Sequence, residues 1–216
     1  MATNVLVIYY SLHGHVAALA RDVVAGGESV RNTTVRLRRF PELADTNAVQ
    51  DQVDEATLDD LRWADGIAWG TPTRYGTMAT PMKRFFDGMV DVWKSGELED
   101  KPAGVFTSTA SIHGGQESTI LTTMVPLLHF GMIFVGTPYV QNPQIMTADA
   151  VGGSPYGPST IAGPDGKRAV ADAELLTARH LGIRLARVAS ALKIVRVTTL
   201  HGRDIDAPAY NTVRGE

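Results

Sequence analysis

Short apolar runs alternate with helical patterns along most of this chain of 216 residues. The first run, Val5 to Tyr10, is continuous, which suits a strand that is buried on both faces of a parallel sheet. Further strands are predicted near residues 34–39, 65–69, 103–107 and 132–135. Five such runs with helices between them are typical of βαβ units, so we predict an α/β protein with a doubly wound, five-stranded parallel sheet.

Helices are predicted between these strands from apolar residues at spacings of three and four. The first helix covers about residues 15–28, and Gly26-Gly27 is interpreted as its end. The pattern Thr57-Leu58-Asp59-Asp60 predicts the start of a second helix with a capping box. The last helix is predicted over about residues 172–195.

Two stretches depart from this rhythm. Residues 137–171 are rich in Gly and Pro and show no clear helix or strand pattern. Loops longer than ~12–15 residues are uncommon and are usually functional or disordered. Residues 196–216 are polar and follow the last predicted helix. We therefore expect one domain over residues 1–195, with 137–171 as an insertion after the fifth strand, and a C-terminal extension over 196–216.

The composition narrows the classes of function. The formal net charge is −3 and no Lys/Arg cluster occurs, which argues against a nucleic-acid partner. The chain has no cysteine, which excludes thiol redox chemistry, so a redox role would need a bound organic cofactor. The apolar stretch near the N-terminus is far shorter than the ~20 residues of a membrane span. We expect a cytoplasmic protein without membrane insertion.

Three unusual loops, at residues 11–16, 70–77 and 108–116, follow the first, third and fourth predicted strands. In a dinucleotide-binding sheet of order 3-2-1-4-5 the first loop would read Gly-x-Gly-x-x-Gly, whereas this chain has Ser11-Leu12-His13-Gly14-His15. In a sheet of order 2-1-3-4-5 the three strands are neighbours, and ligands bind beyond their carboxyl ends. The sequence therefore predicts the 2-1-3-4-5 order and one crevice lined by all three loops.

The loop 11–16 has the features of an anion site. Ser11 directly follows a buried strand, Gly14 allows a tight turn, and free N–H groups at the start of a helix favour a phosphate. Ser11 and His13 can donate further hydrogen bonds. The alternative is an ordinary strand–helix turn in which Ser11 is a helix cap. His13 and His15 have no nearby acidic or cysteine partner, so we expect no metal site.

The loop 70–77 begins Gly70-Thr71-Pro72-Thr73-Arg74-Tyr75-Gly76 and combines backbone donors, a cation and an aromatic ring. That mixture suits a planar cofactor whose edges form hydrogen bonds and whose faces stack. The loop 108–116 is rich in hydroxyl groups and glycine and lacks the Gly-x-Ser-x-Gly of a hydrolase. We interpret this third loop as a rim of donors for the polar edge of a ring, although a second phosphate site is also possible.

These loops, together with Gly115-Gln116-Glu117, Gly152-Gly153-Ser154-Pro155-Tyr156-Gly157 and Thr160-Ile161-Ala162-Gly163, resemble the WrbA-type NAD(P)H:quinone oxidoreductases over about residues 4–193. The resemblance implies a flavodoxin-like fold, a bound FMN and a homotetramer in which neighbouring subunits close the pocket. Segment 137–171, with Tyr156, would then be interface and wall. The FMN-binding residues that it implies are Ser11, Leu12, His13, Gly14, His15, Val16, Pro72, Thr73, Arg74, Tyr75, Gly76, Ser108, Thr109, Ala110, Ser111, His113, Gly114, Gly115 and His129.

The same resemblance implies an activity. NADH or NADPH would deliver a hydride to N5 of the flavin, and a quinone would then replace the oxidised nicotinamide and receive that hydride. His129 would take part in catalysis at the pyrimidine edge of the flavin, whereas His13 and Trp93 would face the substrates. The alternatives are a flavodoxin-type electron carrier and a non-catalytic flavin-binding interaction protein. The sequence does not distinguish NADH from NADPH or identify the quinone.

Three features differ from the family pattern. Met89-Val90-Asp91-Val92 replaces a short Gly-rich connection before Trp93, and the loop 108–116 is one residue longer than usual. Pro126 lies in the helix before His129, where it removes a backbone donor and is expected to kink the helix. These differences bear on the shape of the pocket and the choice of substrate more than on the cofactor.

Overall fold

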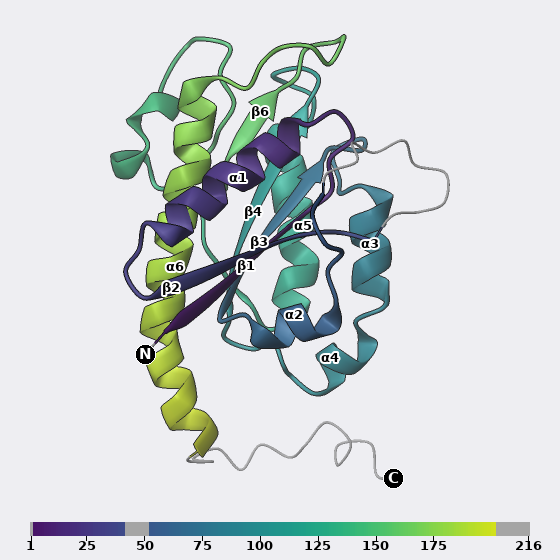
Figure 1. Ribbon diagram of the computed structural model, residues 1–216. Coiled ribbons are helices and arrows are strands. Elements are labelled where there is room, and N and C mark those ends of the chain that lie inside the picture. Colours follow the sequence, from purple (N-terminus) through teal and green to yellow (C-terminus); the bar gives the residue numbers. More distant parts are fainter. Residues whose placement is uncertain (1, 42–51, 202–216) are drawn as a thin grey trace.

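The computed structural model describes residues 2–41 and 52–201 and shows a parallel sheet between two layers of helices (Figure 1). The main path of the sheet has the order β2-β1-β3-β4-β5, and each pairing along it is parallel. The strands are β1 (Thr3–Tyr9), β2 (Thr33–Arg39), β3 (Gly66–Pro72), β4 (Pro102–Thr109), β5 (Ile133–Phe134) and β6 (Ser159–Ile161). The predicted α/β fold and its 2-1-3-4-5 order are confirmed.

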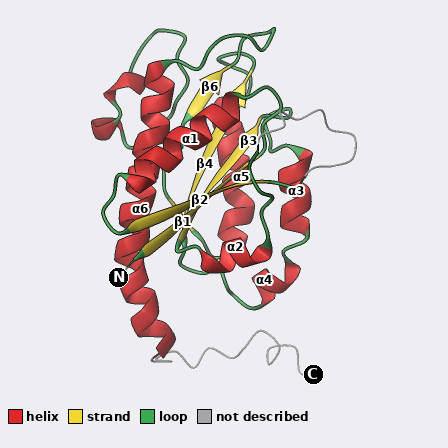
Figure 2. Cartoon of the chain, in the orientation of Figure 1, coloured by secondary structure: helices red, strands yellow, loops and turns green. Residues whose placement is uncertain are grey.

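Two sets of helices cover the two faces of the sheet (Figure 2). One face packs against α1 (His15–Glu28) and α6 (Asp172–His201), and the other against α2 (Leu58–Trp63), α3 (Thr80–Asp87), α4 (Val90–Lys94) and α5 (Gln116–His129). Successive side chains of β1 alternate between the layers, since Val5 and Val7 pack with α1 and α6, whereas Leu6 and Ile8 pack with the other helices. The continuous apolar run of β1 therefore serves two hydrophobic cores.

The fifth strand is divided into two pieces, which the sequence did not predict. β5 pairs with Pro102 and Ala103 at the start of β4, and β6 pairs with Thr107 to Thr109 at its end. Both pieces use the edge of β4 that β3 leaves free. The insertion 137–171 therefore contains an element, β6, as well as the 3-10 turns η1 (Tyr139–Gln141) and η2 (Pro143–Ile145). Three residues are too few to show the alternation by which a strand is recognised.

α1 has the predicted bounds, but Gly26 and Gly27 lie in its last turn and the C-cap residue is Ser29, so the glycines do not end the helix as predicted. A Cβ on Gly26 would lie 2.0 Å from the carbonyl oxygen of Arg179, and one on Gly182 would lie 2.0 Å from that of Val23. Both Arg179 and Gly182 belong to α6. These glycines therefore allow the backbones of α1 and α6 to cross in direct contact, a tertiary reason that periodicity does not reveal.

Other element bounds also differ from the prediction. α6 continues to His201 instead of ending near residue 195, so the expected extension begins inside a helix, and residues 202–216 lie outside the described residues. α5 includes Pro126 and continues to His129. β3 runs through Pro72, so Gly70 belongs to a strand. A Cβ on Gly70 would lie 2.3 Å from the ring of Phe106, which explains the glycine there.

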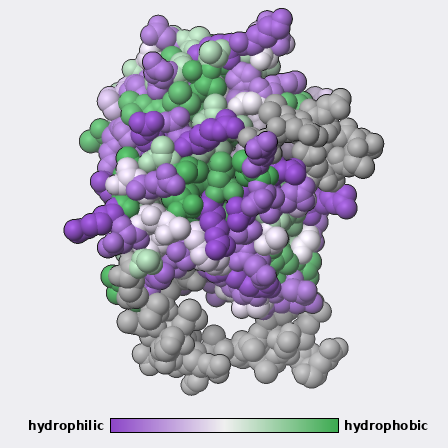
Figure 3. Space-filling model, viewed as in Figure 1, coloured by the Kyte–Doolittle hydropathy of each residue, from purple (hydrophilic) through white to green (hydrophobic). Residues whose placement is uncertain are grey.

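The surface on the side viewed in Figure 1 is mostly hydrophilic, with apolar residues gathered near its middle (Figure 3). Several large apolar side chains are exposed on the described part of the chain, among them Tyr75, Val125, Leu128 and Val140. Within the described residues, each helix is either too short or too polar to cross a membrane.

Candidate functional site

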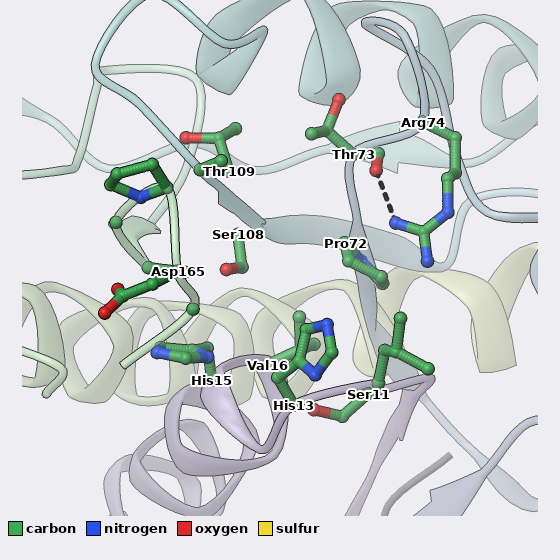
Figure 4. A pocket seen from close by; sticks show the side chains of 16 residues that line it. Ser11, His13, His15, Val16, Pro72, Thr73, Arg74, Ser108, Thr109 and Asp165 are labelled. Carbon is green, nitrogen blue, oxygen red and sulfur yellow. Dashed lines mark hydrogen bonds between the residues drawn. The ribbon is translucent and has the colours of Figure 1, made fainter. Parts of the chain in front are cut away.

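A pocket of about 290 Å³ opens at the carboxyl ends of the strands, where the three predicted loops meet (Figure 4). A fourth segment, residues 162–166 after β6, forms its remaining wall. The lining residues are Ser11, Leu12, His13, His15, Val16, Pro72, Thr73, Arg74, Ser108, Thr109, Ala110, Ala162, Gly163, Pro164, Asp165 and Gly166. The predicted crevice therefore exists, and its loops come together because β1, β3 and β4 are neighbours in the sheet.

The first loop presents the N-terminus of α1 to the pocket. Gly14 is the N-cap residue and adopts a left-handed conformation with φ of 89°, which favours glycine. Its N–H donates to Oγ of the buried Ser11 at 3.1 Å, which fixes the turn. No side chain of the described residues caps this helix, so its first N–H groups are available to an anion.

The second loop is a tight turn that carries Arg74 and Tyr75. The backbone groups of Arg74 and Thr77 bond each other at 2.7 and 3.1 Å, and Tyr75 and Gly76 between them have φ of 53° and 81°. These angles are those of a type I′ turn. The Arg74 side chain lines the pocket and its Nη1 donates to the Thr73 carbonyl at 2.8 Å (Figure 4). The Tyr75 side chain is fully exposed beside the pocket.

The third loop is tied to the second through α5. The Thr119 hydroxyl, on the buried side of α5, donates to Oγ1 of Thr73 at 2.8 Å, and the Gly76 N–H donates to the same oxygen at 3.1 Å. A Cβ on Gly115, the N-cap of α5, would lie 3.0 Å from Cα of Gly76. The two loops are therefore in van der Waals contact. Ser108, Thr109 and Ala110 line the pocket, whereas Ser111, His113, Gly114 and Gly115 continue this loop beyond the lining.

The fourth wall contacts the first loop directly. The ring nitrogen Nε2 of His15 is 2.8 Å from the carbonyl oxygen of Arg168, to which it can donate a hydrogen bond. A Cβ on Gly166 would lie 3.8 Å from the ring of His13, so this ring lies close against the wall. Sequence reasoning assigned a wall to segment 137–171 in general but did not identify residues 162–166. The resemblance of Thr160-Ile161-Ala162-Gly163 to WrbA-type proteins was the sequence feature that could have indicated this wall.

His129 and Trp93 lie together, away from the pocket. Nε1 of Trp93 donates to the carbonyl oxygen of His129 at 3.0 Å and thereby links α4 to the C-terminal end of α5. His129 lines a second hollow of about 480 Å³ between α3 and α5, with Thr77, Met78, Thr80, Lys83, Thr122, Val125 and Pro126. Tyr156 of the insertion also lies outside the pocket lining and is about one-third exposed, at 38%. Within this chain these residues stay outside the lining of the first pocket, although the second hollow also includes Thr77 of the loop 70–77.

Glu174 is a fully buried carboxylate behind the fourth wall. Burial by itself raises the pKa of Glu174, but hydrogen bonds from the Ala171 N–H, Arg168, the Gly152 N–H and Thr160 outweigh it, so the pKa lies below its ordinary value. The carboxylate is therefore charged at neutral pH. It forms an ion pair with Arg168 at 3.0 Å.

Comparison with known proteins assigns the family. A profile of the family described as NADPH-dependent FMN reductase matches residues 3–147, more than half of the chain. A protein of Solidesulfovibrio magneticus named NAD(P)H dehydrogenase (quinone) is 45% identical over 88% of this chain and 99% of its own length. The Quinone-oxidoreductase QR2 of Triphysaria versicolor is 42% identical over 89% of this chain and 98% of its own length.

Solved structures agree with these relatives. The crystal structure of the flavodoxin, WrbA-like protein from Agrobacterium tumefaciens superposes with a TM-score of 0.64, at 25% identity over 88% of this chain and 99% of that one. Flavodoxin 1 from Bacillus cereus shares the fold, with a TM-score of 0.56 at 15% identity over 86% of this chain and 98% of that one. The fold and the pocket thus define a flavodoxin-like α/β protein with a pocket at the start of α1. The chain belongs to the NADPH-dependent FMN reductase family, and the resemblance to WrbA-type proteins is confirmed.

Proposed function

We propose that this protein is an FMN-dependent NAD(P)H:quinone oxidoreductase that transfers two electrons as a hydride. The observation that carries the proposal is the pocket at the carboxyl ends of β1, β3 and β4, where an uncapped helix N-terminus and two donor-rich loops converge. The family and the names of its relatives support the same reaction. When bound, FMN would supply the redox chemistry, accepting a hydride from the nicotinamide and passing it to the quinone.

The residues of the pocket fit FMN in its two parts. The phosphate would be held by Ser11 and by the N–H groups at the start of α1, from Gly14 to Val16, where the helix dipole also favours an anion. The flavin ring would lie between the turn at residues 73–76 and the loop 108–115. Their backbone N–H groups would stabilise negative charge on the reduced ring, an effect of about 3 kcal/mol for one well-placed donor.

We propose that the active form is a homotetramer and that residues 1–195 are its FMN-binding domain. His129 and Trp93, the residues proposed to act at the ring edge and on the substrate, lie outside the pocket of their own chain, which supports a site completed by another copy. Exposed Tyr75, Val125 and Leu128 supply apolar surface for such contacts. Light scattering of the purified protein should give four times the mass of the chain. The use of nicotinamide nucleotides fits a cytoplasmic location.

A flavodoxin-type electron carrier is the second candidate, since flavodoxins share the fold. Titration with FMN should quench flavin fluorescence, NADH or NADPH should bleach the bound flavin, and benzoquinone should restore its absorbance in equal amount. A flavin spectrum that the protein leaves unchanged would exclude both flavin functions. Bound flavin that neither nucleotide bleaches, while a one-electron reductant gives a stable half-reduced spectrum, would favour the carrier.

A further inference from the structure

The fourth wall of the pocket is a short excursion of the chain with little packing of its own. Pro164 and Asp165 at its tip are exposed, and Gly163 and Gly166 are half-buried with φ of 80° and 68°. Three backbone bonds shape its base, from Ala162 to Thr109 at 2.7 Å, from Gly166 to Gly163 at 3.1 Å and from Arg168 to Ala162 at 2.9 Å. An exposed segment without an apolar core keeps one position only if polar contacts behind it hold it there.

Those contacts converge on Glu174 at the first turn of α6. Its two carboxylate oxygens accept hydrogen bonds from five donor groups, at 2.8 to 3.3 Å: the N–H groups of Gly152, Ile161 and Ala171, the hydroxyl of Thr160, and the guanidinium of Arg168. These donors come from the insertion, from β6, from the end of the wall and from the approach to α6. One buried charge therefore ties the second half of the insertion, including β6, to the start of α6.

Arg168 connects Glu174 to the pocket. Besides Glu174, its guanidinium donates to the carbonyl oxygens of Ile161 at 2.7 Å and Ala150 at 3.2 Å. Its own carbonyl oxygen is 2.8 Å from Nε2 of His15 in the anion loop. Ile161 before the 162–166 wall and Arg168 after it are thus both bonded to Glu174. Arg168 also contacts His15, in the loop proposed to hold the phosphate.

We propose that Glu174, acting through Arg168, is a positioning residue that holds the 162–166 wall against the N-terminus of α1 in the geometry that binds FMN. Glu174 does not line the pocket, so it would act without touching FMN. This inference rests on the proposed function for the identity of the ligand. Preorganising the wall removes the cost of ordering it when the ligand binds.

The test substitutes Glu174→Gln in the full-length protein and uses Asp60→Asn as the matched control. Asp60 is also a buried carboxylate that accepts bonds from arginines, Arg36 at 3.2 Å and Arg38 at 3.3 Å, but it lies outside the pocket. An amide in place of Glu174 keeps one acceptor oxygen and points N–H groups at donors. We expect FMN affinity, measured by fluorescence quenching, to fall about tenfold or more in Glu174→Gln because the wall must then be ordered on binding. Asp60→Asn should leave FMN affinity unchanged.

Hydrogen exchange of the FMN-free proteins provides a second readout. Glu174→Gln should accelerate exchange in peptides covering residues 150–168 while the sheet keeps its protection, whereas a general loss of stability would accelerate exchange throughout the chain. If Glu174→Gln does not fold, Arg168→Gln serves as the second variant, since it removes the guanidinium and leaves the carboxylate bonded to the backbone. Wild-type FMN affinity in a folded variant, or unchanged exchange at 150–168, would overturn the proposal. Wild-type protein that binds no FMN would refute the proposed function instead, and the exchange data would still show whether Glu174 orders the wall.

Discussion

The two ends of the sheet differ in whether selected polar groups have partners within the protein. At the amino ends of the strands, two charged side chains are paired: Lys101 is buried and its Nζ donates to the carbonyl oxygen of Leu61 at 2.9 Å, and Asp65 accepts from the N–H of Asn4 at 2.9 Å and from Lys193 at 2.7 Å. At the carboxyl ends, α1 begins without a side-chain cap and faces a pocket.

This contrast separates stability from binding. Buried donors and acceptors that find partners within the protein add to the free energy of unfolding and leave nothing to offer a ligand. Donors left free at the rim of a pocket contribute little to stability but are already oriented for an anion or a ring edge. Substitutions at the carboxyl ends should therefore change FMN affinity, and substitutions at the amino ends should change stability alone.

The largest effect on binding is expected for Gly115→Ala. The residue has φ of 99°, and its new Cβ would lie 3.0 Å from the backbone of Gly76 and 3.2 Å from Oγ1 of Thr73. The left-handed conformation itself costs about 1–2 kcal/mol for alanine. Because the clash also separates the two loops, we expect FMN affinity to fall on the order of 100-fold, or about 2.7 kcal/mol, in a fluorescence titration.

Gly96→Ala is the control for this substitution. Gly96 also has positive φ, 66°, but its new Cβ would meet only the flexible end of the Glu99 side chain, away from the pocket. A similar loss of FMN affinity in Gly96→Ala would show that backbone strain in general, and not the contact between the two loops, weakens binding.

At the opposite end of the sheet, Lys101→Met should lower stability without changing FMN affinity. The substitution removes the donor to the buried carbonyl group of Leu61, at 2.9 Å in the native protein, and to the partly buried carbonyl group of Arg62, at 3.2 Å. Loss of such bonds costs about 1–3 kcal/mol, measurable as a shift in the urea midpoint. The exposed Lys94→Met should stay within about 0.5 kcal/mol of wild type. Weaker FMN binding in Lys101→Met would contradict the expectation that substitutions at the amino ends of the strands change stability alone.

The smallest effect is expected for Thr119→Val, which removes the hydroxyl that bonds Thr73. One such hydrogen bond is worth about 1 kcal/mol, so FMN affinity should fall about fivefold if the bond holds the turn in place. Thr123→Val, one turn further along α5, is the matched control, because Thr123 is equally buried and its hydroxyl has no partner among the described residues. Equal FMN affinities in the two variants would show that the Thr119 bond does not position the turn.

Much of the site was predictable because it depends on strand order and local turns. The apolar run of β1 and the absence of Gly-x-Gly-x-x-Gly indicated the 2-1-3-4-5 order, which brings the loops after β1, β3 and β4 together. Local chemistry also indicated the tight turn at Gly14, whose N–H donates to Oγ of Ser11. The wall at residues 162–166 could not be predicted in the same way, because the preceding strand, β6, has only three residues and is defined by its pairing with β4.

The fold, the strand order and three of the four walls of the pocket can be predicted from residue patterns, since hydrophobic periodicity and turn-forming residues act over short distances along the chain. Only the tertiary structure showed that the fifth strand is divided, that Gly26 and Gly182 let α1 and α6 touch, and that Glu174 gathers donors from residues 152 to 171. Each of these features depends on groups from separate elements meeting in space. A buried carboxylate among its donors looks in the sequence like any glutamate at the start of a helix.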